Sequence, residues 1–172
     1  MASLMEDLLD TLEQENAEYE QLLALSLKKT PVIISADLAQ LQQITDEEQI
    51  IVSRINRLDK VRNDCMKQIA GVIHKDVNEL TLGMVVDIFK KRPEEHKKLA
   101  NVYDKLRDTI AQLKRANEQN SQLIQSSLEM VQFDMNILHA MKTAPETANY
   151  SRKAYNTGDI MGIGAGSFDA KQ

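Results

Sequence analysis

The sequence predicts an all-α protein: an elongated antiparallel helical bundle or coiled coil of three long helices plus a short helix, with a disordered C-terminal tail. Apolar residues recur at steps of three and four over long stretches, and the few Pro residues lie where a helix would begin or end. Only 4% of the residues are aromatic, and Trp is absent. Low aromatic content with many Leu, Ile, Glu, Gln and Lys residues favours long packed helices over a compact core.

The first helix is expected over residues 3–29. Acidic residues occupy its start and Lys28 and Lys29 its end, which complements the helix dipole. Pro31 is expected to end it, because proline disfavours helical geometry in the residue before it, and Ser35 is the expected N-cap of the next helix. One face carries residues at helical spacing: Leu4, Leu8, Leu12, Glu15, Tyr19, Leu22 and Ser26.

The second helix is expected over residues 36–75, and it has the most regular heptad pattern of the chain. Two of its heptad core positions are charged, and such residues more often fix register or reach solvent than perform chemistry. The single cysteine lies at another core position and is interpreted as a small apolar filler. The heptad positions are Leu41, Ile44, Glu48, Ile51, Ile55, Leu58, Arg62, Cys65, Ile69 and Val72.

A short helix is expected over residues 81–90, capped by Thr81 and closing one end of the bundle. The last helix is expected over residues 93–142, where Pro93 suits the first turn and two acidic residues follow it. An apolar seam from Leu99 to Leu113 gives way to an almost wholly polar stretch, 114–122, and then resumes with a shifted phase. We interpret the polar stretch as the boundary between a bundle-building half and a half with another role.

Residues 121–142 carry more apolar surface than one packed face requires. About half of the positions are apolar, several are Met, and together they cover far more than a stripe of about 100°. A second helix of the same chain, a second copy of the protein or a foreign helix must cover the remainder. Because Met-rich surfaces adapt to partner shapes, binding of a client protein is the favoured hypothesis. Packing on the first helix and dimerisation stay open.

Several classes of function are disfavoured. The net charge of −5 comes from the segment 1–30, and no basic stripe interleaved with aromatic residues suggests nucleic acid. His74, His96 and His139 have no metal-ligand spacing, no phosphate-binding loop is found, and no set of titratable residues indicates an active site. The prediction is no enzyme, no catalytic residue, no cofactor and no metal. Without an apolar run of membrane-spanning length or a signal peptide, the predicted location is cytoplasmic, without membrane insertion.

Residues 143–172 are expected to form a flexible tail. They are rich in Gly, Ala, Ser, Thr and Asn, without periodicity. The tail holds Tyr150 and Tyr155, and Tyr155-Asn156-Thr157-Gly158 has the form of a short docking motif. From the residues alone, a docking role for Tyr155 and a stray aromatic residue in a disordered tail are both open.

Three segments together resemble the FlgN-type flagellar export chaperones, in the branch seen in Clostridium-like Gram-positive bacteria. They are DLAQLQQITDEEQIIVSRINRLDKVR, SLEMVQFDMNILHAMKTAPET and NYSRKAYNTGD…FDAKQ, and they span nearly the whole chain. The heptad segment alone is shared with any coiled coil. The Ala-Pro-Glu-Thr junction followed by Tyr and Asn is more specific.

The resemblance implies a cytosolic chaperone that binds the C-terminal amphipathic helix of the hook–filament junction proteins FlgK and FlgL. It implies that the chaperone prevents their premature assembly and delivers them to the cytoplasmic domain of the export gate protein FlhA. It assigns gate docking to Tyr155 or, second, Tyr150. The alternative is a structural homodimeric coiled-coil adaptor without a client. The expected client-binding residues are Leu123, Ile124, Leu128, Val131, Met135, Leu138 and Met141.

Overall fold

The computed structural model describes residues 2–143, with side chains from Leu4 onward, and every regular element in this range is helical. The elements are α1 (Ala2–Ile34), α2 (Leu38–Ile73), α3 (Leu82–Ile88), a 3₁₀ turn η1 (Phe89–Lys91) and α4 (Pro93–Thr143). The predicted all-α helical bundle is confirmed. The described residues divide into two units between Ser126 and Ser127, a first unit up to Ser126 and a second that begins at Ser127.

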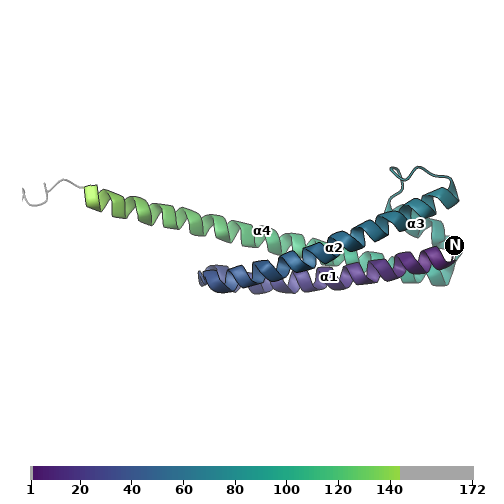
Figure 1. Cartoon of the computed structure of the whole chain (residues 1–172), viewed down its shortest axis with the longest axis horizontal. Helices are drawn as coiled ribbons and strands as arrows, with labels where there is room; N and C mark the ends of the chain where they lie inside the picture. Colours follow the sequence, from purple (N-terminus) through teal and green to yellow (C-terminus); the bar gives the residue numbers. More distant parts are fainter. Residues whose placement is uncertain (1, 144–172) are drawn as a thin grey trace, which may run out of the picture. The chain divides into compact units, whose positions relative to one another are not determined.

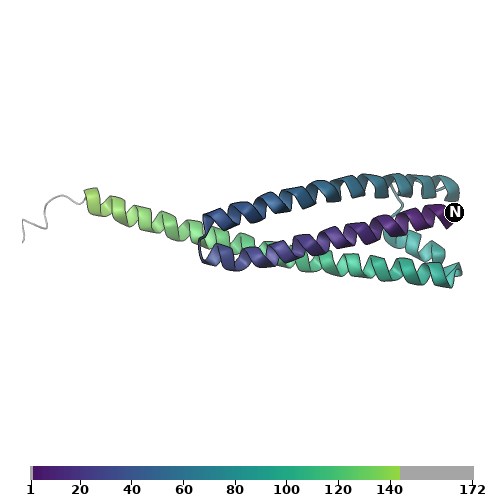
Figure 2. The same cartoon turned by 60° about the horizontal axis from the view of Figure 1, so that its bottom comes forward.

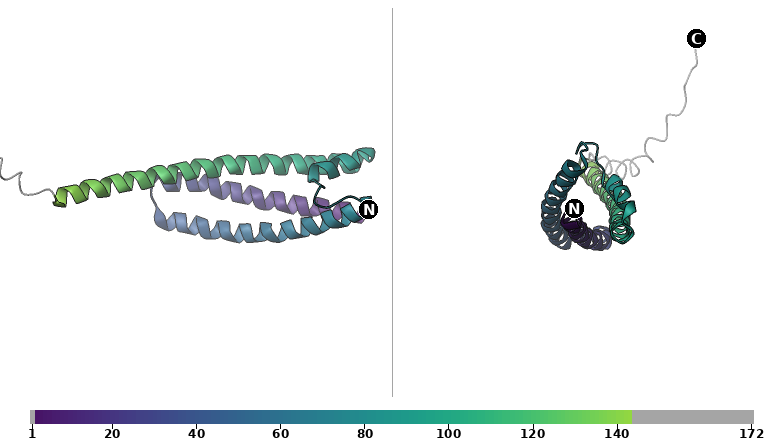
Figure 3. Two further views of the ribbon diagram at one scale, coloured as in Figure 1. Left: turned by 90° about the horizontal axis from the view of Figure 1, so that it is seen from above. Right: turned by 90° about the vertical axis from the view of Figure 1, so that its right-hand side faces the viewer.

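In the first unit, α1 lies between α2 and the first part of α4. It forms an antiparallel hairpin with α2, in which Lys29 bonds Glu48 and Glu15 bonds Arg62. It runs parallel to α4. Asn16 of α1 contacts Thr109, and Thr30, further along α1, contacts Asn120, further along α4. Figure 1 shows α1 and α2 side by side, Figure 2 draws α1 between α2 and α4, and the end-on view of Figure 3 places the three helices of the unit at the corners of a triangle.

The expected end of the first helix at Pro31 is wrong, because α1 continues through Pro31 to Ile34. Proline removes one helical hydrogen bond, but Val32 and Ile33 beyond it are almost fully buried. Their packing outweighs the lost bond. Two residues beyond the end of the helix, Ala36 has a φ of 54° and donates its N–H to the Ile33 carbonyl at 3.1 Å.

The cap predicted for the second helix is also wrong. Asp37 is the N-cap of α2, and its carboxylate accepts the N–H of Gln40 at 3.0 Å. The Ser35 hydroxyl instead donates to the Val32 carbonyl at the end of α1. At the other end, His74 adopts a left-handed conformation and donates its N–H to Ala70. The helix therefore spans 38–73 rather than 36–75.

The core is densest where α3 meets the long helices. Thr81 caps α3 as predicted, accepting the N–H of Met84 at 3.3 Å, but the helix stops at Ile88 and continues as the 3₁₀ turn. Val85 and Phe89 are buried with side chains from all three long helices. The expected apolar cap is thus present in a shorter form. The buried cluster comprises Met5, Leu8, Leu12, Cys65, Met66, Ile69, Ala70, Leu80, Val85, Val86, Phe89, Leu99 and Leu106.

The polar stretch 114–122 belongs to the bundle, contrary to its interpretation as a boundary. Asn120 is buried, donates to the Ser26 carbonyl at 2.7 Å and accepts from the Thr30 hydroxyl at 2.6 Å. The Ser26 hydroxyl also donates to the side-chain oxygen of Asn117 at 2.7 Å. We call these four residues the polar layer. Sequence periodicity overlooked it because polar side chains take positions that apolar residues usually occupy.

Candidate functional site

The last part of α4, residues 127–143 in the second unit, exposes large apolar side chains on all sides. Every residue in this range is exposed. A helix that is apolar over most of its circumference is normally buried, so this segment has the surface of a helix that is covered by a partner. The exposed fractions include Leu128 60%, Met130 67%, Val131 58%, Phe133 64%, Met135 59%, Ile137 43%, Leu138 55% and Met141 72%.

The seven predicted client-binding residues fall in both units. Leu128, Val131, Met135, Leu138 and Met141 are exposed in the second unit. The other two lie in the first unit. Leu123 is half-buried, and Ile124 lines a cavity of about 390 Å³ with residues of α1, α2 and α4.

The exposed segment carries few groups for chemistry. Its charged side chains are Glu129, Asp134 and Lys142, and its one other titratable residue is His139. Between residues 2 and 143 no group of His, Cys, Asp or Glu has an arrangement that would hold a metal ion. The arrangement of this segment supports apolar protein contacts.

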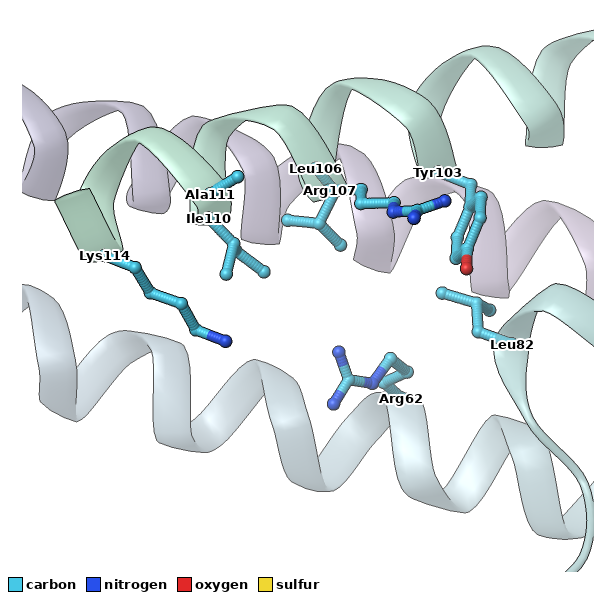
Figure 4. A pocket seen from close by; sticks show the side chains of 8 residues that line it. All are labelled: Arg62, Leu82, Tyr103, Leu106, Arg107, Ile110, Ala111 and Lys114. Atoms are coloured by element: carbon cyan, nitrogen blue, oxygen red, sulfur yellow. The ribbon is translucent and has the colours of Figure 1, made fainter.

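A second surface feature, which the sequence did not predict, is a basic groove in the first unit between α2 and α4. Figure 4 shows Arg62 of α2 and Lys114 of α4 extending into the space between these helices, with Leu82 of α3 at one end. The cavity here has a volume of about 390 Å³. We define the basic groove by its lining residues, Arg62, Leu82, Tyr103, Leu106, Arg107, Ile110, Ala111 and Lys114. The sequence pattern of a single helix does not reveal this groove, because its lining residues come from three helices.

Arg62 at the edge of the groove is held by two carboxylates. It donates to Glu15 of α1 at 2.9 Å and to Asp59 one turn earlier in α2. Burial raises the pKa of the Glu15 carboxyl, which is 1% exposed; the Arg62 guanidinium opposes this shift and Asp59 adds to it. The second oxygen of Glu15, Oε1, has no hydrogen-bond partner. Arg62 therefore has a fixed position and serves packing within the bundle.

Cys65 is buried in the core, as the sequence predicted for a small apolar filler. Burial raises the pKa of its thiol, and Asp7 and Asp64 add to the shift. A thiol whose pKa is raised is less reactive, because the thiolate is the nucleophile. His74 caps α2, and His96 and His139 lie on α4. Tyr150 and Tyr155, the predicted docking residues, lie outside the residues that the structure describes.

Among the described helices, none has an apolar stretch of the length that a membrane span requires. In the comparison with known proteins, the family model described as FlgN protein matches residues 1–158. Neither the curated proteins nor the solved structures contain a match to the chain. Because the family model covers most of the sequence, and the fold is the helical bundle described above, the chain belongs to the FlgN family of flagellar export chaperones.

Proposed function

We propose that this protein is a cytosolic export chaperone for the hook–filament junction proteins FlgK and FlgL. The observation that carries the proposal is the exposed apolar surface of residues 127–143, in a chain whose family consists of chaperones. A client would lay the apolar face of its C-terminal amphipathic helix against this surface, the helix-in-groove mode of recognition. The Met side chains would adapt the surface to two clients of different sequence.

Burial of the predicted contact residues is sufficient for binding. Covering Leu128, Val131, Met135, Leu138 and Met141 would contribute about 1.5–3 kcal/mol for each side chain. Most of this free energy is offset by the loss of rotational freedom and by ordering of the client helix. The remaining affinity permits release at the export gate. Coverage of the client helix prevents its use in premature assembly.

We further propose that the tail delivers the complex to the cytoplasmic domain of FlhA, with Tyr155 or, second, Tyr150 as the docking residue. This assignment rests on the resemblance of the tail and on the turn-forming Asn156-Thr157-Gly158 that follows Tyr155. Assignment to the Clostridium-like branch of the family rests on the same resemblance. Without a client, the exposed segment would be covered by a second copy of the chain, which the client displaces.

The proposed contact is tested with Val131→Asp/Leu138→Asp in the full chain. Two carboxylates in the contact face would have to be desolvated on binding, so affinity for FlgK and FlgL should fall at least ~100-fold. Isothermal titration calorimetry with each purified client measures this change. Circular dichroism should show unchanged helix content, because both side chains are exposed.

The matched control is Gln132→Asp/His139→Asp, which places two carboxylates at the same spacing of seven, one residue further along the helix. It should retain client affinity within about threefold, because neither residue is a predicted contact. Equal affinity of all three proteins for the clients would refute the assignment of residues 127–143. A stable dimer that neither FlgK nor FlgL disturbs would favour the structural adaptor without a client.

A further inference from the structure

The basic groove of the first unit is an unfilled position beside α2 and α4. Side-chain contacts of α1 reach both neighbouring helices: Glu18 and Lys29 bond α2, whereas Asn16 and Thr30 bond α4. The cavity of the basic groove has a volume of about 390 Å³ and is lined by residues of α2, α3 and α4. Four-helix bundles have a fourth helix at the corresponding position.

The α4 wall of the groove follows one helical face. Its lining positions run from Tyr103 to Lys114 at steps of three and four, and Arg62 of α2 lies on the other side of the cavity. At 1.5 Å per residue, the α4 wall is about 16 Å long. This length accommodates about three turns of a partner helix.

The lining of the groove has a surplus of positive charge. Its lining includes Arg62, Arg107 and Lys114 and no acidic residue. Arg62 is already paired with Glu15 and Asp59. Among residues 4–143, neither Arg107 nor Lys114 takes part in a salt bridge. These two exposed cations are therefore free to pair with carboxylates of a partner.

The spacing of the two cations defines the partner. Arg107 and Lys114 are seven residues apart, which is two helical turns or about 10.5 Å, and the apolar Leu106 and Ile110 lie in the same lining. One phosphate group cannot span this separation. A second helix presents side chains at the same heptad interval, with apolar residues between them.

We propose that the basic groove binds an acidic amphipathic helix of a partner protein, with two carboxylates one heptad apart facing Arg107 and Lys114. The apolar face of this helix would contact Leu106, Ile110 and Leu82. This site is separate from the proposed client-binding segment, and the proposal does not depend on the identity of the client. Like other exposed ion pairs, the two contacts would select the partner more than they would raise affinity.

The test uses two fluorescently labelled synthetic 21-residue heptad peptides with identical Leu and Ile positions. One carries Glu and the other Lys at two flanking positions one heptad apart. Fluorescence anisotropy measures binding to the full chain at low salt. The Glu peptide should bind at least ~10-fold more tightly, and added salt should reduce this preference by screening.

Charge reversal locates the site. In Arg107→Glu/Lys114→Glu the preference should invert, so that the Lys peptide binds more tightly. Lys105→Glu/Arg115→Glu makes the same change in net charge at exposed positions of α4 outside the groove lining, and it should keep the preference for Glu. Val131→Asp/Leu138→Asp should also keep it, which separates this site from the client-binding segment.

Three results would overturn the proposal. Neither peptide binds the unsubstituted chain, or both bind it with equal affinity. The third is that the two charge-reversal variants have the same preference between the Glu and Lys peptides. A further contrary result is a dimer of the chain that Arg107→Glu/Lys114→Glu dissociates in analytical ultracentrifugation. The groove would then be covered by a second copy. Loss of FlgK and FlgL binding in Val131→Asp/Leu138→Asp is measured in a separate experiment. Failure of the groove proposal can therefore be distinguished from failure of the client-binding proposal.

Discussion

At the residue scale, the charged heptad positions of α2 are paired with α1. Glu48 bonds Lys29, and Arg62 bonds Glu15. The sequence indicated that these two positions serve register or solvation, and periodicity placed Glu15 on the same face of the first helix as its leucines. The sequence pattern could not predict which charged residues pair, because this depends on how α1 and α2 are aligned along their axes.

The carboxyl of Glu15 provides a pH-dependent test. Its raised pKa means that, between the ordinary value of 4.5 and the raised one, the folded protein retains a proton that the unfolded chain loses. Glu15 therefore makes folding less favourable as pH rises through this window. In Glu15→Gln this contribution is absent, and the amide oxygen still accepts from Arg62.

The free energy of unfolding of Glu15→Gln, relative to the parent, should rise as pH increases from about 4.5 to 8. Urea unfolding at a series of pH values measures this difference. Glu13→Gln, at an exposed position of α1, is the control for the loss of one negative charge. A difference that falls with pH would contradict the burial of this carboxyl, because it would mean that the Arg62 pairing dominates.

At the scale of elements, apolar periodicity predicted the number, order and approximate bounds of the helices. It failed at Pro31, where local geometry favoured a break and burial of Val32 and Ile33 kept the helix intact. It failed again at residues 114–122, where hydrogen bonds to α1 replace apolar contacts. In both places tertiary contacts decide the outcome, and a single-sequence pattern does not contain them.

The polar layer makes a direct prediction about stability. Asn120→Ala removes, at a buried position, the donor to the Ser26 carbonyl and the acceptor of the Thr30 hydroxyl. The free energy of unfolding should fall by about 1–3 kcal/mol. Gln119→Ala, at the exposed neighbouring position, should change it by no more than about 0.5 kcal/mol.

Urea unfolding followed by circular dichroism compares these two variants with the parent. The slope against urea concentration should be unchanged, because neither substitution alters the surface that unfolding exposes. If Asn120→Ala is as stable as Gln119→Ala, the polar layer contributes nothing measurable to the packing of α4 on α1.

At the scale of the whole molecule, the two candidate surfaces differ in how far the sequence reveals them. The exposed segment was predictable, because an apolar excess on one helix is visible without knowledge of the fold. The start of the segment was less predictable, because Leu123 and Ile124, which were expected to belong to it, lie in the first unit. The basic groove was not predictable, because Arg62, Leu82 and Lys114 come together only when α2, α3 and α4 are placed.

The central claim is that a flagellar client covers residues 127–143. The most direct test is amide hydrogen exchange of the full chain, free and saturated with FlgK, followed by mass spectrometry. Amides of an exposed helix open locally and exchange quickly, whereas a bound partner suppresses such opening. The account predicts strongly slowed exchange at residues 127–141 in the complex, with smaller changes in α2. Unchanged exchange at 127–141, with FlgK bound, would contradict it.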